Sequence, residues 1–168
     1  MSGCKVVGIV GSDPKAMYIK NELNFDYVIN YKKEDVCKRL LEICPNGIDI
    51  YFDNVGGEIL EAVLENLAFR ARIVVCGQIA QYNLANDEVA HGITNFRNIL
   101  TNQATVEGFI VSRFASDFPQ AYSFLERLYT DGKLKTKEDI IINLENTPEA
   151  LLRVLTGKNF GKQIVQIV

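Results

Sequence analysis

The sequence predicts an α/β protein built on a parallel, doubly wound sheet. Short apolar runs alternate along the chain with segments whose apolar residues recur at helical spacing. The apolar runs are continuous rather than alternating, as in strands that helices cover on both faces. Most of them also end in small or polar residues. With 168 residues and 48% apolar content, the chain is long enough to bury a core.

Strands and helices are expected in alternation over the first 111 residues. A helix should follow Pro14, which suits a first helical turn, and two more should span residues 36–44 and 59–67. The five expected strands are Lys5–Val10, Tyr27–Asn30, Ile48–Phe52, Arg72–Cys76 and Val106–Val111.

The pattern changes near Asp131, where we place a boundary between residues 1–130 and 131–168. The second part should hold a strand at Ile140–Ile142 and a closing strand at Gln163–Val168. Between them, Thr147 and Pro148 fit the N-cap and first position of a helix.

Composition excludes several classes of function. The net charge of −3 gives no electrostatic reason for binding nucleic acid or an anionic membrane. The four cysteines form no CxxC pair and there is a single histidine, so we expect reduced thiols and no metal site. Without a signal peptide or an apolar run of bilayer length, a cytoplasmic location is expected.

The strand ends point to a ligand site. They carry Gly11-Ser12, Asn30-Tyr31, Asp53-Asn54-Val55-Gly56-Gly57 and Gly77-Gln78. Ligands of open α/β sheets bind beside the carboxyl ends of the strands, so this pattern favours a cofactor cleft. The alternative is that these residues only build turns and cap helices.

The same strand ends bear on the choice of cofactor. A nicotinamide-binding unit normally shows GxGxxG after its first strand and an acid after its second, and neither occurs here. If Cys4–Val10 is the second strand, Ser12 and Lys15 leave room and positive charge for a 2′-phosphate. This interpretation favours NADP over NAD. The acidic residue Asp13, next to Ser12, argues against it.

Six segments together resemble a known family: "GCKVVGIVGSDPK", "FDYVINYKKEDV", "CPNGIDIYFDNVGGEILEAVL", "RIVVCGQIAQYN", "VEGFIVSRF" and "GKNFGKQIV". They are similar to the nucleotide-binding half of medium-chain dehydrogenases/reductases, in the zinc-independent prostaglandin reductase or 2-alkenal reductase branch. The resemblance implies a Rossmann-type fold and hydride transfer from NADPH to the carbon–carbon double bond of an α,β-unsaturated aldehyde or ketone. Alternatives are a quinone reductase, a non-catalytic dinucleotide-binding module and, more remotely, a methyltransferase.

The resemblance also implies site residues. Tyr82 is the candidate catalytic group, beside the nicotinamide ribose and substrate, while Lys15 and Tyr31 match residues at the 2′-phosphate. The implied cofactor-binding set is Ser12, Lys15, Tyr31, Asn54, Cys76, Gly77, Gln78, Ile79, Tyr82, Phe109, Ile110, Val111 and Asn159.

Several of these residues have plainer interpretations. Cys76 is more simply explained as a core residue, and the two tyrosines as amphipathic surface residues. Asn159 between two glycines could be a left-handed turn residue.

The sequence also departs from the family. Nothing before Gly3 matches the substrate domain, the first strand or the glycine-rich turn, so residues 1–130 are expected to form an incomplete NADP-binding domain, truncated at its start. By the resemblance, residues 131–168 return to the substrate domain, the isolated chain is inactive, and Val106–Val111 pairs edge to edge in a homodimer. The missing strand would be central in the order 3-2-1-4-5-6. The two edges that it leaves could pair directly, recruit a partner's strand or remain loose.

Overall fold

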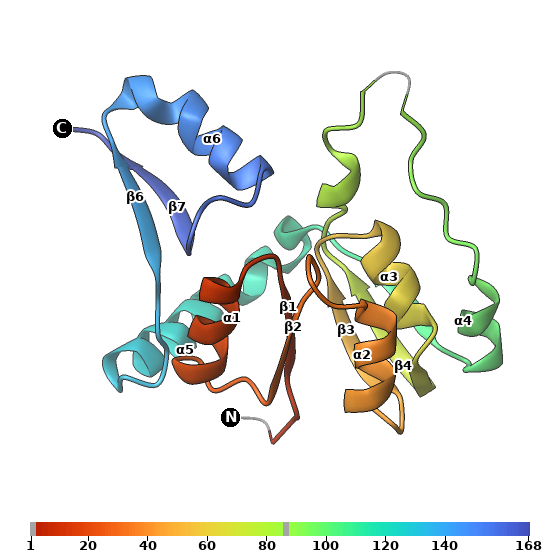
Figure 1. Cartoon of the computed structure of the whole chain (residues 1–168). Helices are drawn as coiled ribbons and strands as arrows, with labels where there is room; N and C mark the ends of the chain where they lie inside the picture. Colours follow the sequence, from red (N-terminus) through yellow and green to blue (C-terminus); the bar gives the residue numbers. More distant parts are fainter. Residues whose placement is uncertain (1–2, 86–87) are drawn as a thin grey trace. The chain divides into compact units, whose positions relative to one another are not determined.

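A computed structural model describes residues 3–85 and 88–168 (Figure 1). The chain divides into two compact units. The first consists of the residues up to Val28 together with Phe114–Val168, and the second consists of Ile29–Arg113.

The first unit contains two small sheets. One joins β1 to β2, and in the other β6 and β7 run parallel. Helix α1 packs on β1, and α6 packs on β7. The bounds are β1 (Val7–Val10), α1 (Asp13–Asn21), β2 (Tyr27–Asn30, whose last two residues belong to the second unit), α5 (Phe118–Thr130), β6 (Glu138–Ile142), α6 (Thr147–Leu155) and β7 (Lys162–Gln166). Short 3₁₀-helices span Val111–Asp117 (η2, which begins in the second unit) and Leu144–Asn146 (η3).

The second unit is built on a three-stranded parallel sheet with the order β3-β4-β5. Helices α2 and α3 pack on each other, and α3 also packs on β3. The bounds are α2 (Val36–Ile43), β3 (Ile48–Asp53), α3 (Gly57–Leu64), β4 (Leu67–Val75), the 3₁₀-helix η1 (Ile79–Gln81), α4 (Arg97–Thr101) and β5 (Thr105–Gly108).

The core of the second unit lies between its helices and one face of its sheet. Tyr51 and Ile73 are paired in register and therefore point to the same face, where Ile73 is buried together with Val63 of α3. On the opposite face, Ile50 and Phe52 are 52% and 55% exposed. The expectation that β3 is buried on both faces is therefore wrong, because the helices that pack here cover one face.

Several predicted boundaries need correction. The strand predicted at Val106–Val111 ends at Gly108, because Val111 already begins η2. The strand predicted at Arg72–Cys76 starts earlier, at Leu67, with a bend at Arg70, whose φ is +60°. Thr147 is the first residue of α6 rather than its N-cap, since Asn146 holds the cap position at the end of η3.

The α/β class with parallel strand pairing is confirmed. The neighbours β1-β2 and β3-β4-β5 are those of the expected strand order, and in the described residues β1 and β3 belong to separate sheets. The predicted boundary at residue 130 falls at the end of α5 and differs from the division into compact units, so the assignment of 1–130 and 131–168 to two domains stays a prediction.

Candidate functional site

The turn after β3 is organised by a buried carboxylate. Asp53 is fully buried, and its Oδ1 accepts hydrogen bonds from the backbone N–H groups of Val55 (2.9 Å) and Gly56 (2.8 Å). Gly56 and Gly57 have φ values of +68° and +56°, in the left-handed region that favours glycine. The Asp-Asn-Val-Gly-Gly motif is thus a tight turn that leads directly into α3.

Asp53 also changes the chemistry of its neighbour Tyr51. The Tyr51 hydroxyl donates to Asp53 Oδ1 over 3.0 Å. Burial, followed by the charge of Asp53 and this hydrogen bond, raises the pKa of Tyr51 well above its usual value. Asp53 was not among the predicted site residues. A sequence signal could have identified Asp53: it is an acidic residue whose carboxylate can accept hydrogen bonds from the backbone N–H groups two and three residues further along a turn.

The loop after β4 is bonded to the same turn. The backbone N–H groups of Cys76 and Gly77 donate to Asp53 O, over 2.8 and 3.1 Å, and that of Ile79 donates to Asn54 O over 3.1 Å. Two strand ends that the sequence singled out therefore meet in the structure, as the carboxyl ends of neighbouring parallel strands should.

Gly77 lies close to both Asn54 and Tyr82. A Cβ atom on Gly77 would lie 3.2 Å from Tyr82 Oη and 3.3 Å from Asn54 O, which leaves little room for any side chain. Tyr82 Oη accepts a hydrogen bond from Gln78 N over 3.2 Å, and the Tyr82 side chain is 63% exposed. Asn54, Gly77, Gln78, Ile79 and Tyr82 thus form one group at this edge of the sheet.

The other predicted site residues of the second unit are Cys76, Phe109, Ile110, Val111 and Tyr31. The Cys76 thiol is exposed, so the interpretation of Cys76 as a core residue is wrong. The Phe109 ring packs edge to face on Phe52, with centroids 6.2 Å apart, while Ile110 and Val111 are exposed beyond the end of β5. Tyr31 is exposed in the turn that follows β2.

The first unit contains Ser12, Lys15 and Asn159. Ser12 holds the N-cap position of α1 without a side-chain hydrogen bond to the helix. Lys15 Nζ donates to Gly157 O over 2.7 Å, and Asn159 Nδ2 donates to Gly161 O over 2.9 Å. Lys15 and Asn159 line the same cavity of about 350 Å³. Among the described residues near this loop, Gly157 and Gly161 have positive φ values and Asn159 does not, so the interpretation of Asn159 as a left-handed turn residue is wrong.

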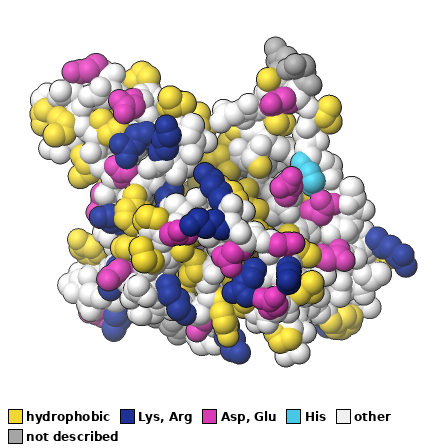
Figure 2. All heavy atoms as spheres, in the orientation of Figure 1, with side chains coloured by type: hydrophobic (Ala, Val, Ile, Leu, Met, Phe, Trp, Pro, Cys, Tyr) yellow, Lys and Arg dark blue, Asp and Glu magenta, His cyan; other side chains and the backbone are white. Residues whose placement is uncertain are grey.

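A polar cluster that the sequence did not single out holds residues 91–94 to α3. We call Glu61, His91 and Thr94 the Glu61 cluster. Glu61 Oε1 accepts from Thr94 N (2.8 Å) and from the Thr94 hydroxyl, and Glu61 Oε2 lies 2.6 Å from His91 Nε2. Figure 2 shows the histidine, in cyan, against acidic side chains. The hydrogen bonds from Thr94, and then that from His91, lower the pKa of Glu61 to about 2.

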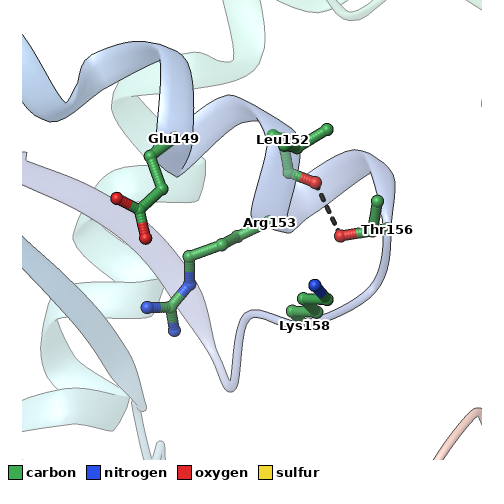
Figure 3. Close-up of a pocket in the computed structure, with 5 residues that line it drawn as sticks. All are labelled: Glu149, Leu152, Arg153, Thr156 and Lys158. Atoms are coloured by element: carbon green, nitrogen blue, oxygen red, sulfur yellow. Dashed lines mark hydrogen bonds between the residues drawn. The ribbon is translucent and has the colours of Figure 1, made fainter.

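Another cavity, of about 280 Å³, lies beside α6 and contains none of the predicted site residues. It is lined by Glu149, Leu152, Arg153, Thr156 and Lys158 (Figure 3). The Thr156 hydroxyl in its wall donates to Leu152 O over 2.7 Å, a bond within the end of the helix.

Within residues 3–85 and 88–168, no group of three or more His, Cys, Asp or Glu side chains is placed to hold a metal ion. No helix in these ranges has the length and apolar character that crossing a bilayer requires.

Residues 1–127 match the sequence profile of the family described as zinc-binding dehydrogenase. The chain is 45% identical to a zinc-type alcohol dehydrogenase-like protein of Schizosaccharomyces pombe, over 98% of this chain and 46% of that protein. It is 40% identical to the NADP(+)-dependent 2-alkenal reductase of Nicotiana tabacum, over 99% of this chain and 48% of that protein.

A solved structure is also similar. The crystal structure of CurA from Vibrio vulnificus in complex with NADPH superposes with a TM-score of 0.90 at 36% identity, covering 99% of this chain and 50% of CurA. The chain thus spans about half the length of the curated relatives and of the structure that it matches.

Proposed function

Since this chain belongs to the zinc-binding dehydrogenase family of medium-chain dehydrogenases/reductases, we propose that it forms the nucleotide-binding part of an NADPH-dependent reductase. The reaction proposed for the whole enzyme is hydride transfer to the carbon–carbon double bond of an α,β-unsaturated aldehyde or ketone. The observation that carries the proposal is 40% identity over 99% of the chain to a relative named as an NADP(+)-dependent 2-alkenal reductase.

The local structure fits a bound dinucleotide in two places. At Gly77 the absence of a side chain lets the loop after β4 approach Asn54 and Tyr82 closely, which brings these candidate cofactor residues together. Around Lys15, a cavity supplies positive charge at the start of α1. Under the proposal, Asn54, Gly77–Ile79, Tyr82 and Phe109–Val111 contact the nicotinamide half, Asn159 is a further residue of the cofactor site, and Ser12, Lys15 and Tyr31 face the 2′-phosphate.

Tyr82 is the protein group proposed to act on the substrate. When bound, the nicotinamide supplies the hydride. Because Tyr82 Oη accepts its hydrogen bond from Gln78 N, the hydroxyl proton can still be directed to an acceptor. An exposed hydroxyl of this kind can donate to the carbonyl oxygen of the substrate, where negative charge develops as the β-carbon receives hydride.

The word zinc in the family description does not fit this stretch of chain. In the described residues no group of His, Cys, Asp or Glu side chains could hold a metal ion, and the histidine is bonded to Glu61. We therefore assign no step to a metal.

The proposal includes a homodimer in the cytoplasm. All four residues of β5 are exposed, and in the described chain β5 is bonded to β4 along one edge, so its other edge can pair with a second copy. In the part of the chain that the structure describes, no disulfide joins any of the four cysteines, as expected in a reducing compartment.

A chimera tests the function. The chain would replace the corresponding half of the tobacco 2-alkenal reductase, with which it aligns over 168 residues. We expect the chimera to oxidise NADPH when a 2-alkenal is added, and Tyr82→Phe to lower kcat about 100- to 1,000-fold while NADPH binding is retained.

Matched samples separate the alternatives. The 168-residue chain by itself should not oxidise NADPH with a 2-alkenal, and robust turnover by the purified chain would contradict this expectation. A chimera active only on quinones would indicate a quinone reductase. A well-folded chimera that binds NADPH without turning over either substrate would indicate a dinucleotide-binding module.

A further inference from the structure

The placement of Tyr82 depends on a very short helix. The Tyr82 side chain is 63% exposed, so packing holds its ring weakly. Its hydroxyl accepts from Gln78 N over 3.2 Å, and its own N–H donates to Ile79 O over 3.3 Å. Both partners belong to the loop that contains η1, and a helix of three residues does not stabilise itself. The position of the Tyr82 hydroxyl therefore depends on what holds η1.

The start of α3 and the turn before it hold one side of η1. Ala80 N donates to Val55 O over 3.1 Å, and a Cβ atom on Gly57 would lie 3.4 Å from the Ala80 Cβ. Glu61 and Glu65 follow Gly57 at intervals of four residues, so the three positions share one side of the helix. The side of α3 that contacts η1 is thus the side that carries these two carboxylates.

The same two carboxylates hold residues 91–98. The Glu61 cluster supplies the bonds to residues 91 and 94. Glu65 Oε2 accepts from the side-chain amides of Asn95 and Asn98, each over 3.0 Å. Asn95 Nδ2 also donates to Glu61 O over 2.9 Å. Residues 91–98 are therefore fixed along α3 by side chains at one stripe of that helix.

A hydrogen bond joins this anchored segment to η1. Gln81 Nε2, in η1, donates to His91 O at 3.5 Å. The ring of the same His91 is bonded to Glu61, whose side chain is 21% exposed and whose lowered pKa keeps it an ionised acceptor at neutral pH. Since Gln81 directly precedes Tyr82, the contacts run from Glu61 through His91 and Gln81 to Tyr82, all within the second unit.

We propose that Glu61 is a positioning residue for Tyr82: by holding His91 it fixes the acceptor of Gln81, and with it the orientation of η1 and the place of the Tyr82 hydroxyl. The inference rests on the proposed function, in which that hydroxyl donates to the substrate. Glu61 acts through other residues and is not proposed to contact the substrate. The effect is expected to be measurable because a displacement of about 1 Å at a reacting group can cost roughly a hundredfold in rate.

A double-mutant cycle in the chimera tests whether Glu61 acts through Tyr82. Glu61→Ala should lower kcat about tenfold and leave NADPH affinity unchanged, because the hydroxyl is misplaced rather than lost. In the Tyr82→Phe chimera the same substitution should have little further effect, since no hydroxyl remains to be placed. Glu61→Gln keeps an acceptor oxygen at the same distance from the backbone and should lose less than Glu61→Ala.

Amide exchange in the 168-residue chain gives a readout that does not need turnover. The Gln78 N–H is bonded to the Tyr82 hydroxyl, so its exchange rate, measured by NMR, reports whether that hydroxyl is in place. Glu61→Ala and Gln81→Ala should both speed this exchange toward the rate in Tyr82→Phe, while the amides of β4 keep theirs. Glu58→Ala, at an exposed position in the first turn of α3, is the matched control and should change neither.

Thermal melting would show which variants are folded, and Glu61→Gln with Gln81→Ala would carry both tests if Glu61→Ala is not. If Glu61→Ala lowers kcat equally in the parent and Tyr82→Phe chimeras, Glu61 supports the fold as a whole and the inference is wrong. An unchanged Gln78 exchange rate would overturn it as well. In either case the proposed function stands as long as the parent chimera turns over a 2-alkenal. A parent chimera without turnover would defeat the proposed function, and the exchange rates would still decide whether Glu61 places Tyr82.

Discussion

At the scale of single residues, Lys15 decides the proposed preference for NADPH over NADH. It lies in the first turn of α1, its amine is held against Gly157 O, and it lines the cavity in the first unit. Replacing Lys15 by alanine should remove one charge-assisted contact to the 2′-phosphate, about 1.5–3 kcal/mol. NADPH affinity should then fall roughly tenfold to a hundredfold, whereas NADH affinity should barely change, as measured by titrating both cofactors against the chimera.

Lys20→Ala provides the control on the same helix. Its amine donates to Asp26 O and does not line the cavity, so NADPH binding should be retained. Equal losses of NADPH and NADH in Lys15→Ala would show that Lys15 supports the fold instead, and the NADP assignment would lose its main residue.

At the scale of elements, the Glu61 cluster attaches residues 91–94 to α3. The pKa of Glu61 is lowered from its ordinary value of 4.5 to about 2 by hydrogen bonds that favour the ionised form. A carboxyl with a lowered folded-state pKa stabilises the fold fully above its ordinary value, and this stabilisation is lost as the pH falls toward the folded-state value. Glu61→Gln should therefore lower the free energy of unfolding above about pH 4.5, and its difference from the parent should shrink toward pH 2.

Denaturant unfolding of parent and variant over this pH range measures that difference, and hydrogen exchange of residues 88–96 reports whether the loss is local. Glu58→Gln, an exposed position on the same helix, is the matched control and should leave residues 88–96 protected. A Glu61→Gln difference that stays constant with pH would show that packing, rather than the charge of Glu61, holds this segment.

At the scale of the whole molecule, exposed apolar surface and open strand edges favour association. Ile50, Phe52 and Val106 are each more than 40% exposed, and β5 has one edge available for pairing. Light scattering at roughly tens of micromolar, a range where exposed edges associate, should give at least twice the mass of one chain. Val106→Lys should shift the chain toward monomer by placing a charge on that edge strand.

Val89→Lys is the control for charge alone, because Val89 is exposed and lies outside every strand that the structure describes. A parent chain with the mass of a monomer would contradict the dimer. A parent dimer that Val106→Lys leaves intact would place the interface elsewhere.

The sequence by itself determined the alternation of elements, the parallel pairing and the family. Continuous apolar runs and helical spacing are local properties, so the bounds Tyr27–Asn30 and the start of β3 at Ile48 agree with the expected ones. Turn chemistry is local as well, which is why the motif at residues 53–57 was correctly placed at a strand end. The resemblance depended on several such motifs in a fixed order and is confirmed by relatives matched over 98–99% of the chain.

Only the tertiary structure decided which surfaces are covered and which polar groups meet. Hydrophobicity predicts that a strand can be buried, but the exposure of Ile50 and Phe52 depends on whether any element packs on that face. The bonds of Glu61 to residues 91–94, and the approach of Lys137 to Gly161, join positions far apart in the chain, which no local pattern encodes. Cys76 illustrates the same limit, because a thiol at the end of a strand becomes core or surface according to the loop that follows it.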